Sequence, residues 1–268
     1  MNKLKRIMAS FLVLCLLIMV GCSDSKKGSN KTIKITVSAA SSMTESLNEL
    51  KDMFEKEHPS ITITYNFGGT GTLRKQVEQG APVDLFFLAS KKDYQLLEKG
   101  GYIQKGNPIF ENQLVIIKQE GTGIDSFKSF LNTNEKVAIG TPEAVPAGTY
   151  SKQMLKSIGA WDKLVKDNRL VFAKDVHHVL NLVETGAVDI GFVYLSDTLQ
   201  ATDIEIMKEI DSNLHGPIKY YMAMMKEQET NQEAVETFYQ YVLLDKGLEV
   251  FETYGFQTNK DEEKSEES

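Results

Sequence analysis

The sequence has 268 residues, of which 41% are hydrophobic and 25% charged, with a formal net charge of −7. This length and composition exclude a broadly disordered chain and fit one large domain or two lobes. The acidic balance, without a basic stretch carrying interleaved aromatic residues, argues against nucleic-acid binding. An acidic protein can still bind an anion where helix N-termini supply a local positive field.

Residues 1–21 have the pattern of a secretory signal peptide. Lys3, Lys5 and Arg6 form a basic start, and the apolar run "IMASFLVLCLLIMV" (7–20) is short for a membrane span. Removal of these three basic residues takes the formal charge to about −10. The mature protein is therefore expected to be acidic and extracytoplasmic.

The stretch "IMVGC" (18–22) resembles a bacterial lipobox, although Met19 stands where Leu is usual. We expect lipid on Cys22, a flexible linker over residues 22–31, and attachment to the outer face of the cell membrane. An ordinary cleaved signal with a chance cysteine is the alternative. The other cysteine, Cys15, lies in the removed segment, so no disulfide is expected.

Strands and helices are predicted to alternate through the rest of the chain, because runs of period 2 and buried apolar runs alternate with runs of helical spacing. The predicted strands are 33–39, 61–67, 83–90, 113–118, 136–141, 170–173, 188–195 and 218–225. The predicted helices are 43–57, 72–80, about 151–157, 176–184 and one long helix ending near 250–256, before a disordered tail at 259–268.

Four predicted strand-to-helix turns carry hydroxyl or small residues. They are "SAASSMT" (38–44), "FGGTGTL" (67–73), "VPAGTYS" (145–151) and "AKDVHHV" (173–179). Runs of βα units imply largely parallel sheets, whose ligands sit beyond the carboxyl ends of the strands. We expect the binding site where these turns converge.

Six segments, in this order, resemble the molybdate-binding proteins of ABC uptake systems: "SAASSMTESLNEL", "FGGTGTLRKQVEQGAPVDLF", "VAIGTPEAVPAGTYSKQML", "GAWDKL", "VDIGFVYLSD" and "YGF". The resemblance covers about residues 34–256. It implies an α/β fold of the periplasmic-binding-protein type, type II-like. Each of its two lobes would be a mostly parallel sheet flanked by helices, and the ligand would lie in the cleft between them. On this basis lobe 1 would comprise 32–112 with 221–258, and lobe 2 would comprise 113–220.

The resemblance also implies a set of ligand-binding residues. Hydroxyl and backbone N–H donors can hold an oxyanion without a charged side chain, so apolar residues can serve through their backbone. The chain has Thr70 where the family often has Ser, and His177 where relatives often have Arg. Whether Ser41 or Ser42 faces the ligand stays open, with Ser42 favoured. The implied residues are Ser42, Thr70 and Tyr194 through hydroxyls, and Ala147 and Val176 through N–H groups.

Structural readings compete with these roles. Ser42 followed by Glu45 fits a capping box, the glycines at 68–71 fit a tight turn, and Tyr194 fits a core aromatic. The pair His177 and His178 lacks further metal-ligating partners in sequence, so no metal site is expected beyond the molybdenum of the oxyanion. We expect packing from Trp161 and a structural hydrogen bond from Asp84.

The predicted function is that of a receptor and not of an enzyme. We expect a monomer without a cofactor that binds molybdate, or tungstate, and delivers it to an ABC permease and its ATPase. A receptor for another tetrahedral oxyanion such as sulfate is the alternative. A secreted hydrolase is disfavoured because the chain has no G-x-S-x-G elbow.

Overall fold

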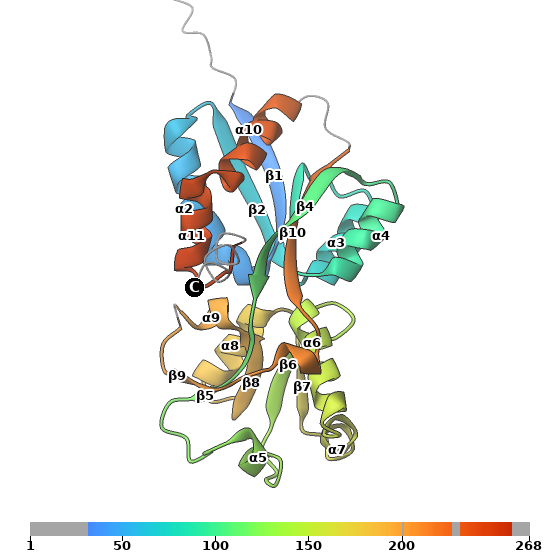
Figure 1. Cartoon of the computed structure of the whole chain (residues 1–268), viewed down its shortest axis with the longest axis vertical. Helices are drawn as coiled ribbons and strands as arrows, with labels where there is room; N and C mark the ends of the chain where they lie inside the picture. Colours follow the sequence, from blue (N-terminus) through green and yellow to red (C-terminus); the bar gives the residue numbers. More distant parts are fainter. Residues whose placement is uncertain (1–31, 200, 227–230, 259–268) are drawn as a thin grey trace, which may run out of the picture. The chain divides into compact units, whose positions relative to one another are not determined.

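The computed structural model describes residues 32–199, 201–226 and 231–258. They fall within one compact unit, residues 32–268, that contains two five-stranded sheets (Figure 1). The predicted signal peptide, Cys22, the linker and the tail at 259–268 lie outside the described residues. Among the residues described, none of the helices has the length and apolar character that a bilayer crossing requires.

We call the first sheet and the helices around it lobe 1. Its strand order is β2-β1-β3-β10-β4. The strands are β1 (Ile33–Ala40), β2 (Ile61–Gly68), β3 (Leu85–Leu88), β4 (Ile103–Asn112) and β10 (Ile218–Met225). The helices are η1 (Ser41–Met43, 3-10), α2 (Thr44–Glu57), α3 (Thr70–Glu78), α4 (Lys91–Lys99), α10 (Gln232–Leu243) and α11 (Asp245–Thr253).

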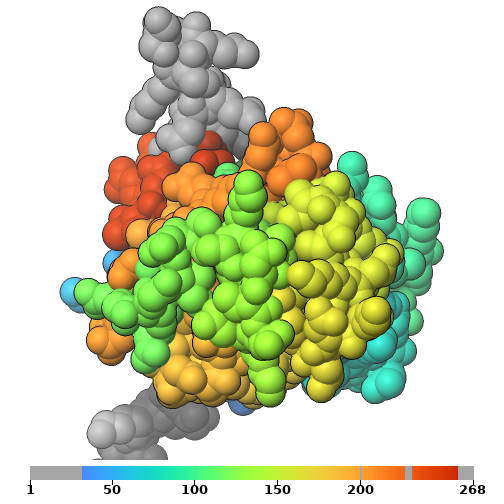
Figure 2. Space-filling view, turned by 90° about the horizontal axis from the view of Figure 1, so that it is seen from below, coloured from blue at the N-terminus to red at the C-terminus, as the bar shows by residue number. Residues whose placement is uncertain are grey.

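Lobe 2 is the second sheet with its helices, in the strand order β7-β6-β8-β5-β9. The strands are β5 (Leu114–Gln119), β6 (Val137–Gly140), β7 (Leu170–Ala173), β8 (Ile190–Tyr194) and β9 (Ile204–Glu209). The helices are α5 (Phe127–Phe130), α6 (Pro146–Ser157), α7 (Trp161–Lys166), α8 (Val176–Glu184), α9 (Leu195–Thr198) and η2 (Ser212–Leu214, 3-10). Figure 2 shows a face on which the α5 region (green) and the α6–α7 region (yellow) are prominent.

The two-sheet α/β architecture is confirmed, and in each sheet four of the five strands share one direction while a single strand, β10 or β5, runs against them. In lobe 1, β1 pairs in parallel with β2 and β3, whereas β10 runs antiparallel to both β3 and β4. Lobe 2 repeats this arrangement, with β5 antiparallel to β8 and β9. The antiparallel strands are those next to the two crossings between the sheets, where the chain leaves the βα pattern.

Several element boundaries differ from the sequence prediction. α3 begins at Thr70 and α6 at Pro146, both earlier than expected. The early start of α6 is explained by its proline, which fits the first helical position. The expected long last helix is two helices, α10 and α11, which separate at Leu244 in extended conformation. A Cβ on Gly247 would lie 2.6 Å from the carbonyl oxygens of Tyr241 and Val242, so the second helix packs tightly under the end of the first.

Two short segments of the chain cross between the lobes. One is the turn from β4 to β5 at Asn112 and Gln113, and the other runs from β9 through η2 to β10. The two crossings lie side by side, because Ile218 at the start of β10 pairs with Asn112 at the end of β4. One cluster of buried apolar side chains, from Ile35 of β1 to Phe192 of β8, continues through both lobes.

Asp84 has the structural role predicted for it. Its Oδ2 accepts the N–H of Thr36 in β1 at 2.7 Å, and the two residues also join through Asp84 N–H to Thr36 O at 2.8 Å. The carboxyl is buried, and burial raises its pKa. Asp84 thereby ties the entry of β3 to the neighbouring strand.

We predict that Asp84→Ala lowers the free energy of unfolding by about 1–3 kcal/mol, because the Thr36 N–H loses its acceptor. Asp84→Asn, which retains a carbonyl oxygen, should lose less. Urea unfolding measures both variants, with Asp125→Ala at an exposed position as the control. Equal losses for the two Asp84 variants would contradict this role of the hydrogen bond.

Candidate functional site

A small cavity between the two lobes contains all five residues predicted as ligand contacts. Its empty volume is about 190 Å³. None of the lining residues has a charged side chain. They are Ala40, Ser41, Ser42, Gly68, Gly69, Thr70, Ala89, Val145, Pro146, Ala147, Val176 and Tyr194.

Lobe 1 contributes hydroxyls from the ends of two adjacent parallel strands. Ser41 and Ser42 follow β1 directly, and Thr70 is the first residue of α3 after β2. The Thr70 hydroxyl oxygen accepts the N–H of Ala89 at 3.2 Å, which leaves its own proton to be donated. Thr70 is fully buried, so this proton has no contact with bulk water.

Lobe 2 contributes the first N–H groups of two helices. Ala147 is the second residue of α6 and Val176 the first of α8, positions whose N–H groups have no acceptor within their own helix. A Cβ on Gly148 would lie 1.8 Å from Gly140 O, so only glycine lets α6 begin directly against β6. The positive ends of both helices therefore lie at the cavity.

The hydroxyl of Tyr194 is the strongest single indication that the cavity is a ligand site. Tyr194 ends β8 and is 1% exposed, and its hydroxyl has no hydrogen-bond partner among the described residues. An unpaired buried hydroxyl is costly, by about 1–3 kcal/mol. Burial also raises the pKa of Tyr194 well above its usual value, so the phenol keeps its proton and can donate it to a bound group.

Ser42 does not cap α2, contrary to the structural reading of the sequence. The N-cap position is Met43, without a side-chain hydrogen bond, and the Ser42 hydroxyl instead lies 2.7 Å from the hydroxyl of Tyr220. This partner of Ser42 among the described residues is a phenol and not a histidine, so it gives no support to an activated nucleophile. Both Ser41 and Ser42 line the cavity, which leaves the choice between them open.

The lobes approach each other through backbone at the glycine turn. Gly71 N–H of lobe 1 donates to Ala144 O of lobe 2 at 2.9 Å. A Cβ on Gly69 would lie 2.8 Å from Ala144 O and 3.0 Å from Lys174 O. The glycines of this turn thus permit a closed arrangement that a side chain would obstruct.

A second contact between the lobes joins His177 to Glu45. The Nε2 of His177, at the start of α8, lies 3.6 Å from a carboxylate oxygen of Glu45 in α2. Both side chains are partly exposed, which limits the contribution of such a pair to about 1 kcal/mol or less. His177, noted in the sequence as a departure from the family, therefore faces the opposite lobe.

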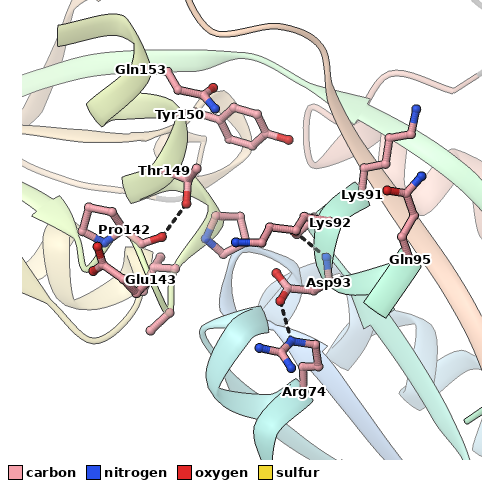
Figure 3. Close-up of a pocket in the computed structure, with 14 residues that line it drawn as sticks. Arg74, Lys91, Lys92, Asp93, Gln95, Pro142, Glu143, Thr149, Tyr150 and Gln153 are labelled. Carbon is pink, nitrogen blue, oxygen red and sulfur yellow. Dashed lines mark hydrogen bonds and ion pairs between the residues drawn. The ribbon is translucent and has the colours of Figure 1, made fainter. Parts of the chain in front are cut away.

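A larger hollow with an empty volume of about 900 Å³ lies outside the cavity, between α4 and the start of α6 (Figure 3). It shares Val145 and Pro146 with the cavity lining. Lys92 points into it from α4, while Arg74 is paired with Asp93 at 2.7 Å. The hollow and the cavity therefore adjoin at the start of α6.

A buried carboxyl, Asp197, stands directly behind Tyr194. Its Oδ2 accepts the Tyr194 N–H at 2.8 Å, and its Oδ1 has no partner among the described residues. Burial raises the pKa of Asp197 to about 7, against the opposing effect of that N–H. Nearby His177 lowers the pKa, and Glu45 and Asp175 raise it further.

Comparison with known proteins agrees with this geometry. Residues 35–257 match the family of bacterial extracellular solute-binding proteins. The chain belongs to this family. The two-lobed fold that the sequence motifs implied is confirmed by the match to solved members with the same architecture.

Three relatives illustrate the family. A Bacillus subtilis protein named "Putative ABC transporter substrate-binding lipoprotein YvgL" is 41% identical over 90% of this chain and 93% of its own length. The molybdate-binding protein ModA of Escherichia coli is 34% identical over 83% of this chain and 88% of its own length. The structure of the Azotobacter vinelandii periplasmic molybdate-binding protein has a TM-score of 0.74 at 24% identity, covering 83% of this chain and 98% of that one.

The family resemblance read from the motifs is thereby confirmed, while the ligand role of the five residues stays a prediction. Sequence reasoning missed Tyr220, Asn112 and Asp197, which surround the cavity without lining it. Only the "SD" within "VDIGFVYLSD" offered a signal for Asp197. In the sequence, Tyr220 is only one residue of the predicted apolar strand at 218–225.

We predict that Gly69→Ala disfavours the closed arrangement. The backbone of Gly69, with φ −67° and ψ 128°, suits any residue, so the added methyl meets only lobe 2. Amide hydrogen exchange at Gly71 should accelerate because its acceptor is Ala144 O. Gly68→Ala is the matched control, since its Cβ would meet Leu73 at an ordinary 3.5 Å. Unchanged protection of Gly71 in Gly69→Ala would contradict the steric argument.

We also predict a pH-dependent effect of Asp197→Asn. Because the folded-state pKa is raised from about 4 to about 7, the folded protein binds this proton more tightly, and stability from this group falls as pH rises through that range. Relative to wild type, the variant should gain stability between pH 5 and pH 8 in urea unfolding. Asp189→Asn, whose carboxylate also accepts a backbone N–H, should show no such gain.

Proposed function

We propose that this protein is an extracytoplasmic receptor that binds molybdate and delivers it to an ABC importer. The observation that carries the proposal is the buried hydroxyl of Tyr194, which has no hydrogen-bond partner within the described part of the chain and lies in a cavity of uncharged donors. A small tetrahedral oxyanion would accept that hydrogen bond together with those of the other lining groups.

The donor set favours an anion without protons of its own. Hydroxyls of Ser42, Thr70 and Tyr194 and the N–H groups of Ala147 and Val176 come from both lobes. Hydrogen bonds to a charged acceptor contribute about 1.5–3 kcal/mol each. Five or six of them can exceed the cost of association, roughly 4–15 kcal/mol, and still leave tight binding.

The names of the relatives support molybdate as the ligand. The E. coli and A. vinelandii proteins are named as molybdate-binding. Tungstate, which has the same charge and shape and nearly the same size, is expected to bind as well. Delivery would go to a membrane permease driven by an ATPase, and the receptor would act as a monomer without enzymatic turnover.

Anchoring by lipid on Cys22 is part of this proposal. The lipobox-like stretch at 18–22 supports it, and so does the name of the B. subtilis relative as a lipoprotein. Mass spectrometry of the membrane fraction should detect a diacylglycerol modification on Cys22 that Cys22→Ala removes.

Isothermal titration calorimetry of the chain from Ser23 onward, with molybdate, tungstate, sulfate and phosphate in turn, tests the ligand. We expect one-to-one binding of the first two and no heat from phosphate. Preferential sulfate binding would retain the receptor function but overturn the ligand. No binding of any oxyanion would contradict the proposal.

We predict that Ser42→Ala and Thr70→Val each weaken molybdate binding about tenfold to a hundredfold, since each removes one hydroxyl donor. The controls are Ser157→Ala and Thr185→Val, whose hydroxyls bond carbonyls of their own helices. Ligand should raise the melting temperature of wild type and controls more than that of the two cavity variants. Wild-type affinity in either cavity variant would remove that residue from the site.

A further inference from the structure

A serine hydroxyl beside an anion is useful only if its proton points at the anion. Ser42 carries one proton and two lone pairs, and its neighbour at 2.7 Å is the hydroxyl of Tyr220. Either oxygen of this pair can be the donor when the pair is taken by itself. The surrounding hydrogen bonds remove that ambiguity.

The orientation of the Asn112 amide is fixed by the backbone. The N–H of Gln113 can only donate, and it lies 2.8 Å from Asn112 Oδ1. Asn112 Nδ2 is therefore the amino group, and it donates to Ser196 Oγ at 2.9 Å and to Tyr220 Oη at 3.4 Å. An amide nitrogen accepts no hydrogen bond, so Tyr220 cannot donate to Asn112.

These bonds favour Tyr220 as the donor to Ser42. Its oxygen accepts from Asn112, and among the described residues the Ser42 Oγ is the one acceptor hydrogen-bonded to the Tyr220 hydroxyl. Tyr220 is fully buried, and burial raises the pKa of its phenol well above the usual value, so the proton is retained. One lone pair of the Ser42 oxygen then accepts from Tyr220, and Ser42 keeps its own proton for donation. Because Ser42 lines the cavity, a group bound there can accept this proton.

We propose that Tyr220 is a positioning residue that holds the Ser42 hydroxyl as a donor toward the ligand, and that Asn112 holds Tyr220 in this role. The proposal rests on the proposed function, because it assumes that an oxyanion occupies the cavity. Under this proposal Tyr220 and Asn112 also determine the affinity for the ligand, although neither residue lines the cavity.

This relay of hydrogen bonds, from Asn112 through Tyr220 to Ser42, also connects the Ser42 hydroxyl to the junction of the lobes. Asn112 is the last residue of β4, where the chain crosses to lobe 2, and Tyr220 lies in the paired strand β10. Ser196, the other partner of the Asn112 amino group, belongs to α9 of lobe 2. Movement of the lobes at this crossing would therefore change the support of Tyr220 and, through it, the direction of the Ser42 proton.

A double-mutant cycle with molybdate separates positioning from general damage. Wild type, Ser42→Ala, Tyr220→Phe and the double variant are titrated by calorimetry, with melting temperatures recorded without ligand. We expect Tyr220→Phe to weaken binding about tenfold in the wild-type background. In the Ser42→Ala background the same change should cost less than about twofold, because the hydroxyl that it orients is absent.

Two variants complete the design. Tyr94→Phe removes a tyrosine hydroxyl that donates to Gly106 O at 3.0 Å away from the cavity, and should leave affinity unchanged. Asn112→Ala keeps the phenol and removes its donor, and should weaken binding only where Ser42 is present. This second cycle tests the relay if Tyr220→Phe does not fold.

The outcomes are distinct. Wild-type affinity in Tyr220→Phe, or losses that multiply independently in the double variant, would overturn the positioning role while leaving the receptor intact. A wild type that gives no heat with molybdate contradicts the ligand identity, and the cycle is then run with the oxyanion that does bind. If no oxyanion binds, both proposals fall together.

Discussion

The uncharged donor groups of this protein surround one small cavity only because both lobes contribute to it. The packing of the lobes against each other is therefore the constraint on which the site depends. Lobe 1 supplies hydroxyls at the ends of β1 and β2, and lobe 2 supplies the starts of α6 and α8 and the end of β8. The lobes must come within backbone hydrogen-bond distance, as at Gly71 and Ala144. Glycine at position 69 leaves the space for this approach.

Charge is kept out of the cavity lining but not far from it. The chain is acidic, with a formal net charge of −7, so attraction of an anion must come from local fields at helix N-termini and not from net charge. Asp197 sits behind Tyr194 with a raised pKa, and in its neutral form it does not oppose an anion. His177 and Glu45 meet where the lobes face each other and leave the cavity itself neutral.

The strands that cross between the lobes lie beside the cavity. The antiparallel pairing of β4 and β10 places Asn112 and Tyr220 beside the cavity, although neither residue lines it. Through Tyr220 the crossing strands reach the Ser42 hydroxyl, so the direction of one ligand-facing proton depends on the junction between lobes.

The sequence by itself determined the alternation of strands and helices, because hydrophobic periodicity is local, and the family, because its motifs are short and ordered. It also named the five cavity residues, but only by resemblance: nothing local marks Ala147 and Val176, which act through their backbone. Tertiary structure decided the mixed strand directions, the split of the last helix at Leu244 and the role of Ser42. Ser42 and Tyr220 are 178 residues apart, so their hydrogen bond arises only when β10 returns to the first sheet beside β3.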